Sequence, residues 1–320
     1  MNFNQFEQLI KNSTKILIMT HINPDGDALG SASSMYTTIY DTFKKKSDIL
    51  IIGHLPNCYK FLPNIDKSSL EFDGSMVYDL VICLDVASLD RLSNAKILFD
   101  KALKKINIDH HKTNNNYGDL NFVNPKASST GEVLQEIYNK IGWAISLESA
   151  IGLYTAILTD TGGFRYENTS ENVFKSAAQL VKTGVNPNEI YKNCYEKKSK
   201  NFVMFQNYCV NKAGFEHNNQ VAYTTVYKKD LEKYKAEEDF TEGLVETLRA
   251  IDTTEIAFIA KEIDSKSTKI SMRSKNADVA EICSVYGGGG HTFAAGCIVK
   301  TGIDGAVKRI LKTIEEKLNG

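Results

Sequence analysis

The sequence predicts an α/β protein: an N-terminal domain with a parallel sheet covered by helices on both faces, then a helical linker and a smaller C-terminal α+β domain. A length of 320 residues suits about two domains of roughly 150 residues each. In the first half, short fully apolar runs alternate with helical patterns, which is typical of a buried parallel sheet. Apolar runs of period two follow later in the chain. We place the domains at residues 1–187 and 215–320, with the linker at 188–214.

The expected elements follow one another in a regular order. In the first domain we expect strands at residues 15–20, 48–53, 78–84 and 105–108, and helices at 28–46, 129–141, 147–158 and 170–183. In the second we expect strands at 221–227, 255–262 and 269–274, a helix at 277–286, a glycine run, and a last helix at 304–317. Ser128, Ser129 and Thr130, with Glu132, read as the N-terminus of the second helix.

The composition limits the classes of partner. Charged residues make up 24% of the chain, yet the formal net charge is only −1, which argues against a broad cationic surface for long duplex nucleic acid or an anionic membrane. A short anionic substrate held by a local basic cluster remains compatible. The six cysteines show no CxxC spacing, and no signal or membrane-spanning segment is visible. We therefore expect free thiols and a cytoplasmic location.

Acidic and imidazole residues follow three of the expected strands, at the point where each strand ends. The segment from His21 to Asp27 follows the first strand, Asp85 follows the third, and Asp109-His110-His111 follows the fourth. Because the carboxyl ends of parallel strands share one edge of a sheet, these side chains should meet in one crevice. Asp160, at the end of a helical run, is a fourth contributor to the same crevice.

Several carboxylates in one crevice repel one another unless cations occupy it. Asp and His ligands without thiolates suit Mn, Fe, Co or Zn better than Ca or Mg. We assign one divalent ion to His21, Asp25 and Asp85, and a second to Asp27, Asp85, His110 and Asp160, with Asp85 as the bridge. Four carboxylates then offset two divalent ions, and Asp109 orients an imidazole by hydrogen bonding.

Two ions about 3.5–4 Å apart suit phosphoryl hydrolysis, because a water between them loses a proton easily and attacks phosphorus in line. Each residue alone has a simpler explanation. An Asp after a strand is usually a cap or turn residue, a single His is usually packed and hydrogen-bonded, and a DHH segment fits a polar loop. The metal hypothesis depends on the combined pattern.

A glycine run and three basic residues point to a substrate-binding function. Gly287, Gly288, Gly289 and Gly290 precede His291, and glycines let backbone N–H groups approach a phosphate closely. We expect a helix of small residues to begin after them; a flexible loop is the alternative. Arg273 and Arg165 are candidate phosphate ligands, each with a surface role as the alternative, and His111 either contacts the scissile phosphate or supports His110. Aromatic residues are more often core than base platforms, so none is assigned to the site.

These motifs together resemble the DHH phosphoesterase family. Residues 21–31 resemble its first motif, Asp85 the second, Asp109-His110-His111 the third, and Asp160-Thr161-Gly162 the fourth. Residues 287–291, with Arg273 upstream, resemble the signature of the DHH-associated C-terminal domain. The resemblance implies an active site in the cleft between two domains, Mn²⁺ dependence, the ligand set named above, and substrate contacts from Arg273 and His291. Thr20 stands where the family often has Asp or Ser.

Within the family, the chain is most similar to the stand-alone oligoribonuclease (NrnA-like) type. The resemblance implies hydrolysis of very short oligoribonucleotides to mononucleotides and removal of the 3′-phosphate of 3′-phosphoadenosine 5′-phosphate (pAp), with Asp85, Asp109, His110 and His111 in catalytic roles. The alternatives are a phosphodiesterase for a cyclic or linear dinucleotide such as c-di-AMP or pApA, and a non-catalytic RNA-binding protein. The sequence leaves the oligomeric state open, a homodimer included.

Overall fold

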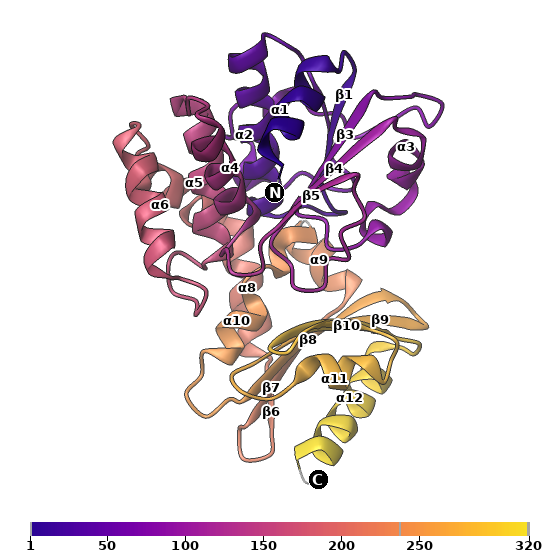
Figure 1. Ribbon diagram of the computed structural model, residues 1–320. Helices are drawn as coiled ribbons and strands as arrows, with labels where there is room; N and C mark the ends of the chain where they lie inside the picture. Colours follow the sequence, from indigo (N-terminus) through magenta and orange to yellow (C-terminus); the bar gives the residue numbers. More distant parts are fainter. Residues whose placement is uncertain (1, 237, 319–320) are drawn as a thin grey trace. The chain divides into compact units, whose positions relative to one another are not determined.

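The computed structural model describes residues 2–236 and 238–318, and the chain divides into two compact units, residues 1–197 and 198–320 (Figure 1). The first unit is built on a five-stranded sheet in the order β2-β1-β3-β4-β5, in which all neighbours run parallel. The strands are β1 (Ile16–Met19), β2 (Asp48–Leu50), β3 (Leu80–Leu84), β4 (Lys104–Asp109) and β5 (Leu120–Val123). The expected α/β class with a parallel N-terminal sheet is confirmed.

Helices cover both faces of this sheet, as the fully apolar strands predicted. The α-helices of the unit are α1 (Phe3–Asn12), α2 (Gly26–Phe43), α3 (Lys96–Lys101), α4 (Thr130–Ile141), α5 (Leu147–Asp160), α6 (Glu171–Lys182) and α7 (Pro187–Tyr191), with short helical turns at Asn57–Tyr59, Ile65–Lys67, Leu89–Ala95 and Lys192–Glu196. Ile16 and Ile18 of β1 pack into one core with α1, α2, α4 and α5. Leu17 and Met19 point to the other face, where α3 completes a second core.

Two glycines let α2 and α5 approach each other closely. A side-chain carbon on Gly30 would lie 2.4 Å from the carbonyl oxygen of Gly152, and one on Gly152 would lie 2.6 Å from that of Gly30. At the start of α2, a side-chain carbon on Gly26 would meet Thr159 at 2.5 Å. This crossing places the N-terminus of α2 beside the C-terminus of α5, and so brings together two segments in which the sequence predicted ligands.

The second unit is built on a six-stranded sheet in the order β10-β11-β9-β8-β7-β6, antiparallel except for the β7–β8 pair. Its strands are β6 (Gly214–Glu216), β7 (Val221–Val226), β8 (Ile256–Asp264), β9 (Ser267–Ser274), β10 (Gly289–His291) and β11 (Ala294–Val299). Its helices are α8 (Lys200–Asn211), α9 (Lys228–Tyr234), α10 (Leu244–Arg249), α11 (Val279–Ser284) and α12 (Ile303–Leu318), with a short turn at Glu238–Thr241. The core with α11 and α12 contains Phe258, whereas Ala257 packs with α8 and α10.

The glycine run forms a strand, so the expectation that a helix of small residues begins there is wrong. Gly289–His291 is β10, paired antiparallel with β11. A side-chain carbon on Gly288 would lie 2.2 Å from the carbonyl oxygen of Gly296, and one on Gly290 would lie 2.3 Å from that of Ala294. Close packing against β11 therefore requires glycine at both positions.

No helix in the described part of the chain is both long enough and apolar enough to span a bilayer. The six cysteines all lie within the described residues, and the structure records no disulfide among them.

We predict that Gly152→Ala destabilises the first unit although alanine favours helices. The added methyl group meets backbone atoms of α2, which cannot rotate away, and overpacking of this kind costs about 1–3 kcal/mol. Urea unfolding measures the difference. The matched control is Gly74→Ala, where the added carbon makes only ordinary contact with Ile97 at 3.5 Å. Equal unfolding midpoints for the two variants would contradict the prediction.

Candidate metal centre

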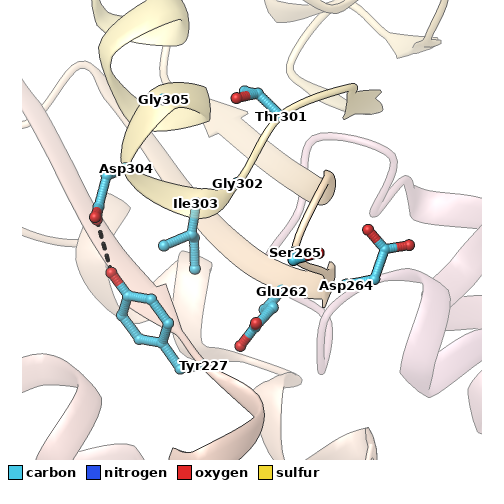
Figure 2. A pocket seen from close by; sticks show the side chains of 9 residues that line it. All are labelled: Tyr227, Glu262, Asp264, Ser265, Thr301, Gly302, Ile303, Asp304 and Gly305. Atoms are coloured by element: carbon cyan, nitrogen blue, oxygen red, sulfur yellow. Dashed lines mark hydrogen bonds between the residues drawn. The ribbon is translucent and has the colours of Figure 1, made fainter.

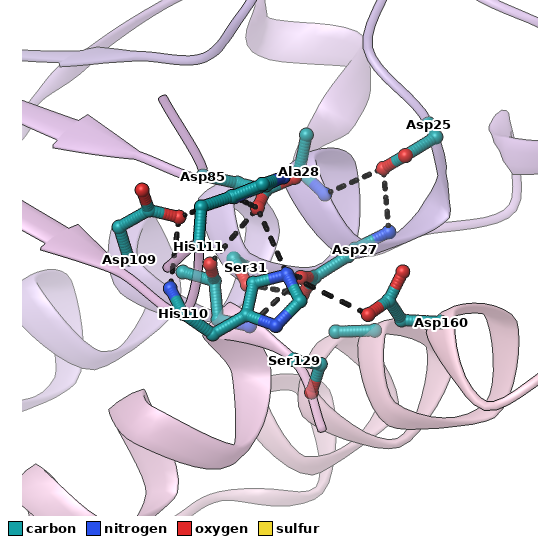
Figure 3. Close-up of polar contacts among 12 residues, drawn as sticks. Asp25, Asp27, Ala28, Ser31, Asp85, Asp109, His110, His111, Ser129 and Asp160 are labelled. Carbon is teal, nitrogen blue, oxygen red and sulfur yellow. Dashed lines mark hydrogen bonds and ion pairs between the residues drawn. The ribbon is translucent and has the colours of Figure 1, made fainter. Parts of the chain in front are cut away.

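The structure brings the predicted acidic and imidazole residues together at the carboxyl edge of the parallel sheet. His21 follows β1, Asp85 follows β3, and the DHH segment begins at the last residue of β4. The other carboxylates come from helix ends: Asp25 and Asp27 from the N-terminus of α2, and Asp160 from the C-terminus of α5. Figure 3 shows the side chains of the DHH segment, Asp85 and the helix-end carboxylates converging from separate elements.

Asp85 is the centre of the cluster. Its Oδ2 lies 3.5 Å from Nε2 of His21, and its Oδ1 lies 3.6 Å from Nε2 of His110. The side chain is only 3% exposed, and its backbone has a φ of +60°, which is costly for a residue with a side chain. Each carboxylate oxygen therefore faces a different histidine, as the predicted bridging position of Asp85 requires.

The remaining ligand atoms form one group around each histidine. Around His21, Oδ2 of Asp25 lies 3.9 Å from Nε2. Around His110, Nε2 lies 3.7 Å from Oδ2 of Asp27 and 3.5 Å from Oδ2 of Asp160. Ligands held about 2.1 Å from a tetrahedral metal ion lie about 3.4 Å from each other, so both groups have the donor types and spacing of a divalent metal site.

Helix N-termini hold two of these carboxylates in place. Asp25 caps α2, and its Oδ1 accepts hydrogen bonds from the backbone N–H groups of Asp27 and Ala28, both at 3.1 Å. Asp27 accepts from the N–H groups of Thr130 at 2.7 Å and Gly131 at 3.0 Å, in the first turn of α4. The positive ends of both helices therefore stabilise negative charge at the cluster.

The segment at residues 128–132 has a larger role than the sequence suggested. Ser129 does cap α4, accepting from the N–H of Glu132 at 3.1 Å, as predicted. In addition, the Thr130 hydroxyl donates to Oδ1 of Asp85 at 3.1 Å. Sequence reasoning missed Thr130 and Gly131 as supports of the site, because only the packing of α4 on α2 aims their donors at the carboxylates.

Asp109 orients the adjacent imidazole. Its fully buried carboxylate accepts from Nδ1 of His111 at 2.7 Å and from the backbone N–H of His110 at 2.8 Å. Asn114 donates to its second oxygen at 2.6 Å. Asn114 had no recognisable motif in the sequence. These bonds satisfy both oxygens of Asp109 and fix the ring of His111 beside Asp85, at 3.5 Å.

The cluster shifts the pKa values of its members in opposite directions. Burial, then the charges of neighbouring carboxylates, raise the pKa of Asp27 and Asp160 well above the usual range. Burial opposes ionisation of Asp85 too, but its hydrogen bond with His21 and the nearby histidine charges hold its pKa well below the usual value. For His111, burial is outweighed by the hydrogen bond with Asp109 and the charge of Asp85, which raise its pKa to about 9.

Two arginines lie close to these elements. Arg165 is exposed on the loop after Asp160, and its Nε donates to the carbonyl oxygen of Gly162 at 2.7 Å. Arg91, which sequence reasoning did not single out, places Nη2 3.0 Å from Nδ1 of His21. Both therefore bring positive charge to segments that carry ligands.

The predicted substrate residues of the second unit lie near one another on its sheet. Arg273 of β9 stands opposite Ala294 of β11, which in turn stands opposite His291 of β10. Nε of Arg273 forms an ion pair with Glu246 at 3.0 Å. Gly289 is exposed, and an added side-chain carbon there would meet nothing within 4 Å. The three strands thus bring an arginine, an exposed glycine and a histidine to the same end of the sheet.

The second unit also has a pocket of about 250 Å³ at the start of α12 (Figure 2). Glu262, Asp264 and Asp304 line it, and Asp304 accepts a hydrogen bond from the Tyr227 hydroxyl at 2.7 Å. None of the predicted substrate residues lines this pocket, and its carboxylates repel anions, so it is unsuited to a phosphate group.

Comparisons with known proteins agree with this arrangement. The model of the "DHH family, N-terminal domain" matches residues 15–162, and that of the "DHHA1 domain" matches residues 218–320. The chain therefore belongs to the DHH family of phosphoesterases, a class of hydrolases, and carries a DHHA1 domain after its DHH domain.

Individual relatives resemble nearly the whole chain. It is 30% identical to the "Bifunctional oligoribonuclease and PAP phosphatase NrnA" of Bacillus subtilis, with 89% of each chain covered. It is 28% identical to the protein of the same name from Thermus thermophilus, covering 95% of this chain and 90% of that one. The crystal structure of an exopolyphosphatase-related protein from Bacteroides fragilis is 26% identical, with a TM-score of 0.92 over 98% of this chain and 95% of that chain.

We predict that divalent metal stabilises the protein more strongly as the pH rises from 6.5 to 9. Without metal, the raised pKa of His111 makes the folded state bind a proton more tightly than the unfolded chain, so this contribution to stability is full below pH 6.5 and is lost as the pH rises through about 9. The raised pKa values of Asp27 and Asp160 act in the same direction. Metal binding, in contrast, is favoured by deprotonated ligands.

The measurement is the unfolding temperature in EDTA and in MnCl₂ at pH 6.5, 7.5 and 8.5. The gain on adding metal should grow with pH in the wild type and shrink in Asp160→Asn, which lacks one ligand charge. A gain that is equal at the three pH values, or unchanged in Asp160→Asn, would contradict the assignment of this cluster to metal.

Proposed function

We propose that the protein hydrolyses very short oligoribonucleotides to mononucleotides and also removes the 3′-phosphate of pAp, using two bound Mn²⁺ ions. The observation that carries the proposal is Asp85, whose two oxygens face His21 and His110 at 3.5 and 3.6 Å. The names of the NrnA relatives from two bacteria support the choice of substrates.

The donor set supports the choice of metal. His21, Asp25 and Asp85 would hold one ion, and Asp27, Asp85, His110 and Asp160 the other. Oxygen and imidazole donors without thiolates suit Mn²⁺, and four carboxylates balance the charge of two divalent ions. When bound, such ions supply Lewis acidity, which makes a water more acidic and neutralises charge on the phosphoryl group.

The protein's own groups would orient the reaction. We assign His111 to the scissile phosphate, because its imidazole is held by Asp109 and has a raised pKa of about 9, which favours the positively charged form at neutral pH. Thr130 and the α4 N-terminus fix Asp85 and Asp27, so the ligands need little rearrangement when the site fills. Arg165 would bind a non-bridging phosphate oxygen from the loop after Asp160.

The DHHA1 unit would anchor the rest of the substrate. We assign this role to Arg273 and His291, with Gly289 and Gly290 allowing a terminal phosphate to approach the backbone. Gly288 is a poorer candidate than the sequence suggested, because its backbone N–H already donates to the carbonyl oxygen of Cys283 at 3.0 Å. The near-neutral net charge agrees with a substrate that needs few phosphate contacts. We also propose a cytoplasmic location, which six cysteines without a recorded disulfide support.

We predict that Asp85→Ala lowers kcat/KM on a 5′-phosphorylated diadenylate by more than about 100-fold. Loss of a supporting residue around a metal ligand typically costs 10–100-fold, and loss of a shared ligand should cost more. Steady-state kinetics with MnCl₂ measures the effect. The control is Asp100→Ala, which removes an exposed carboxylate paired with Lys96 on α3. Near wild-type turnover by Asp85→Ala would refute the assignment.

A substrate panel tests the proposed specificity. Linear pApA, an RNA trimer, pAp and cyclic di-AMP are compared under identical Mn²⁺, and the products are identified by mass. We expect the highest kcat/KM on the short linear RNAs and measurable phosphate release from pAp. A preference for the cyclic dinucleotide would replace the proposal with the signalling phosphodiesterase. Tight RNA binding without any hydrolysis would favour a non-catalytic protein.

A further inference from the structure

We propose that Tyr166 is a stacking platform for a nucleobase, and that the base belongs to the nucleotide whose phosphate lies at the metal centre. The proposal rests on the proposed function and extends it by naming a subsite that the sequence did not reveal. Its basis is the loop after Asp160, where an aromatic side chain lies against the backbone and remains partly exposed.

The loop keeps Tyr166 close to the cluster. Asp160 ends α5, and the chain turns back at once: the backbone N–H groups of Arg165 and Tyr166 both donate to the carbonyl oxygen of Thr161, at 2.9 and 3.1 Å. The side chain of Asn168 then donates to the carbonyl oxygen of Asp160 at 3.1 Å. The hydrogen bond to Thr161 therefore holds Tyr166 beside the residue that follows Asp160, a predicted metal ligand.

The ring of Tyr166 rests on Gly162. A side-chain carbon on Gly162 would lie 2.3 Å from Cζ of Tyr166, and 2.5 and 2.6 Å from its two Cε atoms. Because these three ring atoms are almost equally close, the ring lies across the glycine. Gly162 also has a φ of +58°, which suits glycine. The residue is still 44% exposed, so part of the side chain is accessible to a ligand.

The other aromatic side chains of the loop region have partners that explain their positions. Phe164 packs edge-on against Tyr154 at 5.9 Å and stacks with Phe174 at 5.7 Å. Tyr191 contacts Tyr195 at 4.9 Å. No ring–ring contact is recorded for Tyr166 within the described residues, whereas Phe174 and Tyr191, which are similarly exposed, each contact another ring.

The chemistry next to the ring favours a nucleotide as the occupant. Arg165 precedes Tyr166, and its Nε–Gly162 bond holds the guanidinium at the same loop. A nucleotide joins its base to its phosphate through one sugar, so a phosphate bound by Arg165 and the cluster would bring its base to this loop. Stacking on an aromatic ring contributes about 1–3 kcal/mol per base and tolerates any base, as hydrolysis of mixed short RNAs requires.

The first test compares substrates with and without a base. Kinetics are measured on pApA and on matched dinucleotides in which one base is replaced by an abasic residue. We expect Tyr166→Ala to raise KM for pApA about tenfold, with kcat within about twofold. Tyr166→Phe, which keeps the ring, should behave as the wild type. On the abasic substrate that lacks the stacked base, Tyr166→Ala and the wild type should have equal KM values.

A second readout does not depend on turnover. Binding of AMP and of ribose 5-phosphate to the protein in MnCl₂ is measured by calorimetry, because neither compound is a substrate of the proposed reaction. We expect the wild type to bind AMP more tightly than ribose 5-phosphate, and Tyr166→Ala to lose most of that difference. The control is Tyr40→Ala: Tyr40 is 45% exposed and lies near the far end of α2 from Asp27, about 20 Å away along the helix.

An unchanged KM for pApA in Tyr166→Ala would overturn the platform. So would an equal rise on both abasic substrates, which would indicate a structural role. Equal wild-type affinities for AMP and ribose 5-phosphate would do so as well. If the wild type binds AMP through Tyr166 but hydrolyses none of the RNA substrates, the proposed function fails while the platform stands. Unfolding temperatures of the variants confirm that they remain folded.

Discussion

The concentration of negative charge around Asp85 is the constraint on which the rest of the site depends. Oxygen atoms of four carboxylates lie 3.5–3.9 Å from the Nε2 atoms of two histidines. Burial, and then the repulsion between neighbouring carboxylates, raise the pKa values of Asp27 and Asp160. The protein offsets part of this charge with helix N-termini and imidazoles. Divalent cations would balance the remainder, and this connects the cluster to the phosphoester chemistry of the family.

Three separate features of the fold bring these charged side chains together. The parallel sheet aligns the ends of β1, β3 and β4, so His21, Asp85 and the DHH segment arrive at one edge. The glycine contact between α2 and α5 brings two helix ends together with their carboxylates. The α4 helix then points its first N–H groups at Asp27. A change in any one of these features would alter the balance of positive and negative charge, because each positions a different part of the same cluster.

The sequence could predict which residues meet at this edge because they obey a local rule: polar residues that directly follow apolar strands lie at the carboxyl ends of those strands. His21, Asp85 and His110 follow that rule. It could not predict Thr130 or Gly131, whose donors reach the site only through tertiary packing.

The prediction of a helix after the glycine run was wrong for a related reason. Its glycines face the backbone of β11, and nothing in the local sequence indicates that strand. The sequence predicted a linker at residues 188–214, and the structure divides the chain between residues 197 and 198, within that range.

Tyr166 shows why the general tendency of aromatic residues to lie in the core cannot identify an aromatic side chain that binds a ligand. Most aromatic side chains in this chain pack against other rings or into a core, so composition gave no reason to select one. What distinguishes Tyr166 is its pairing with a glycine four residues earlier at a positive φ. The same short loop then fixes three things at once: the end of α5 with Asp160, the guanidinium of Arg165, and the partly exposed ring. A ligand that engages the ring therefore acts on the segment that also positions a metal ligand, which would couple base recognition to the geometry of the reaction centre.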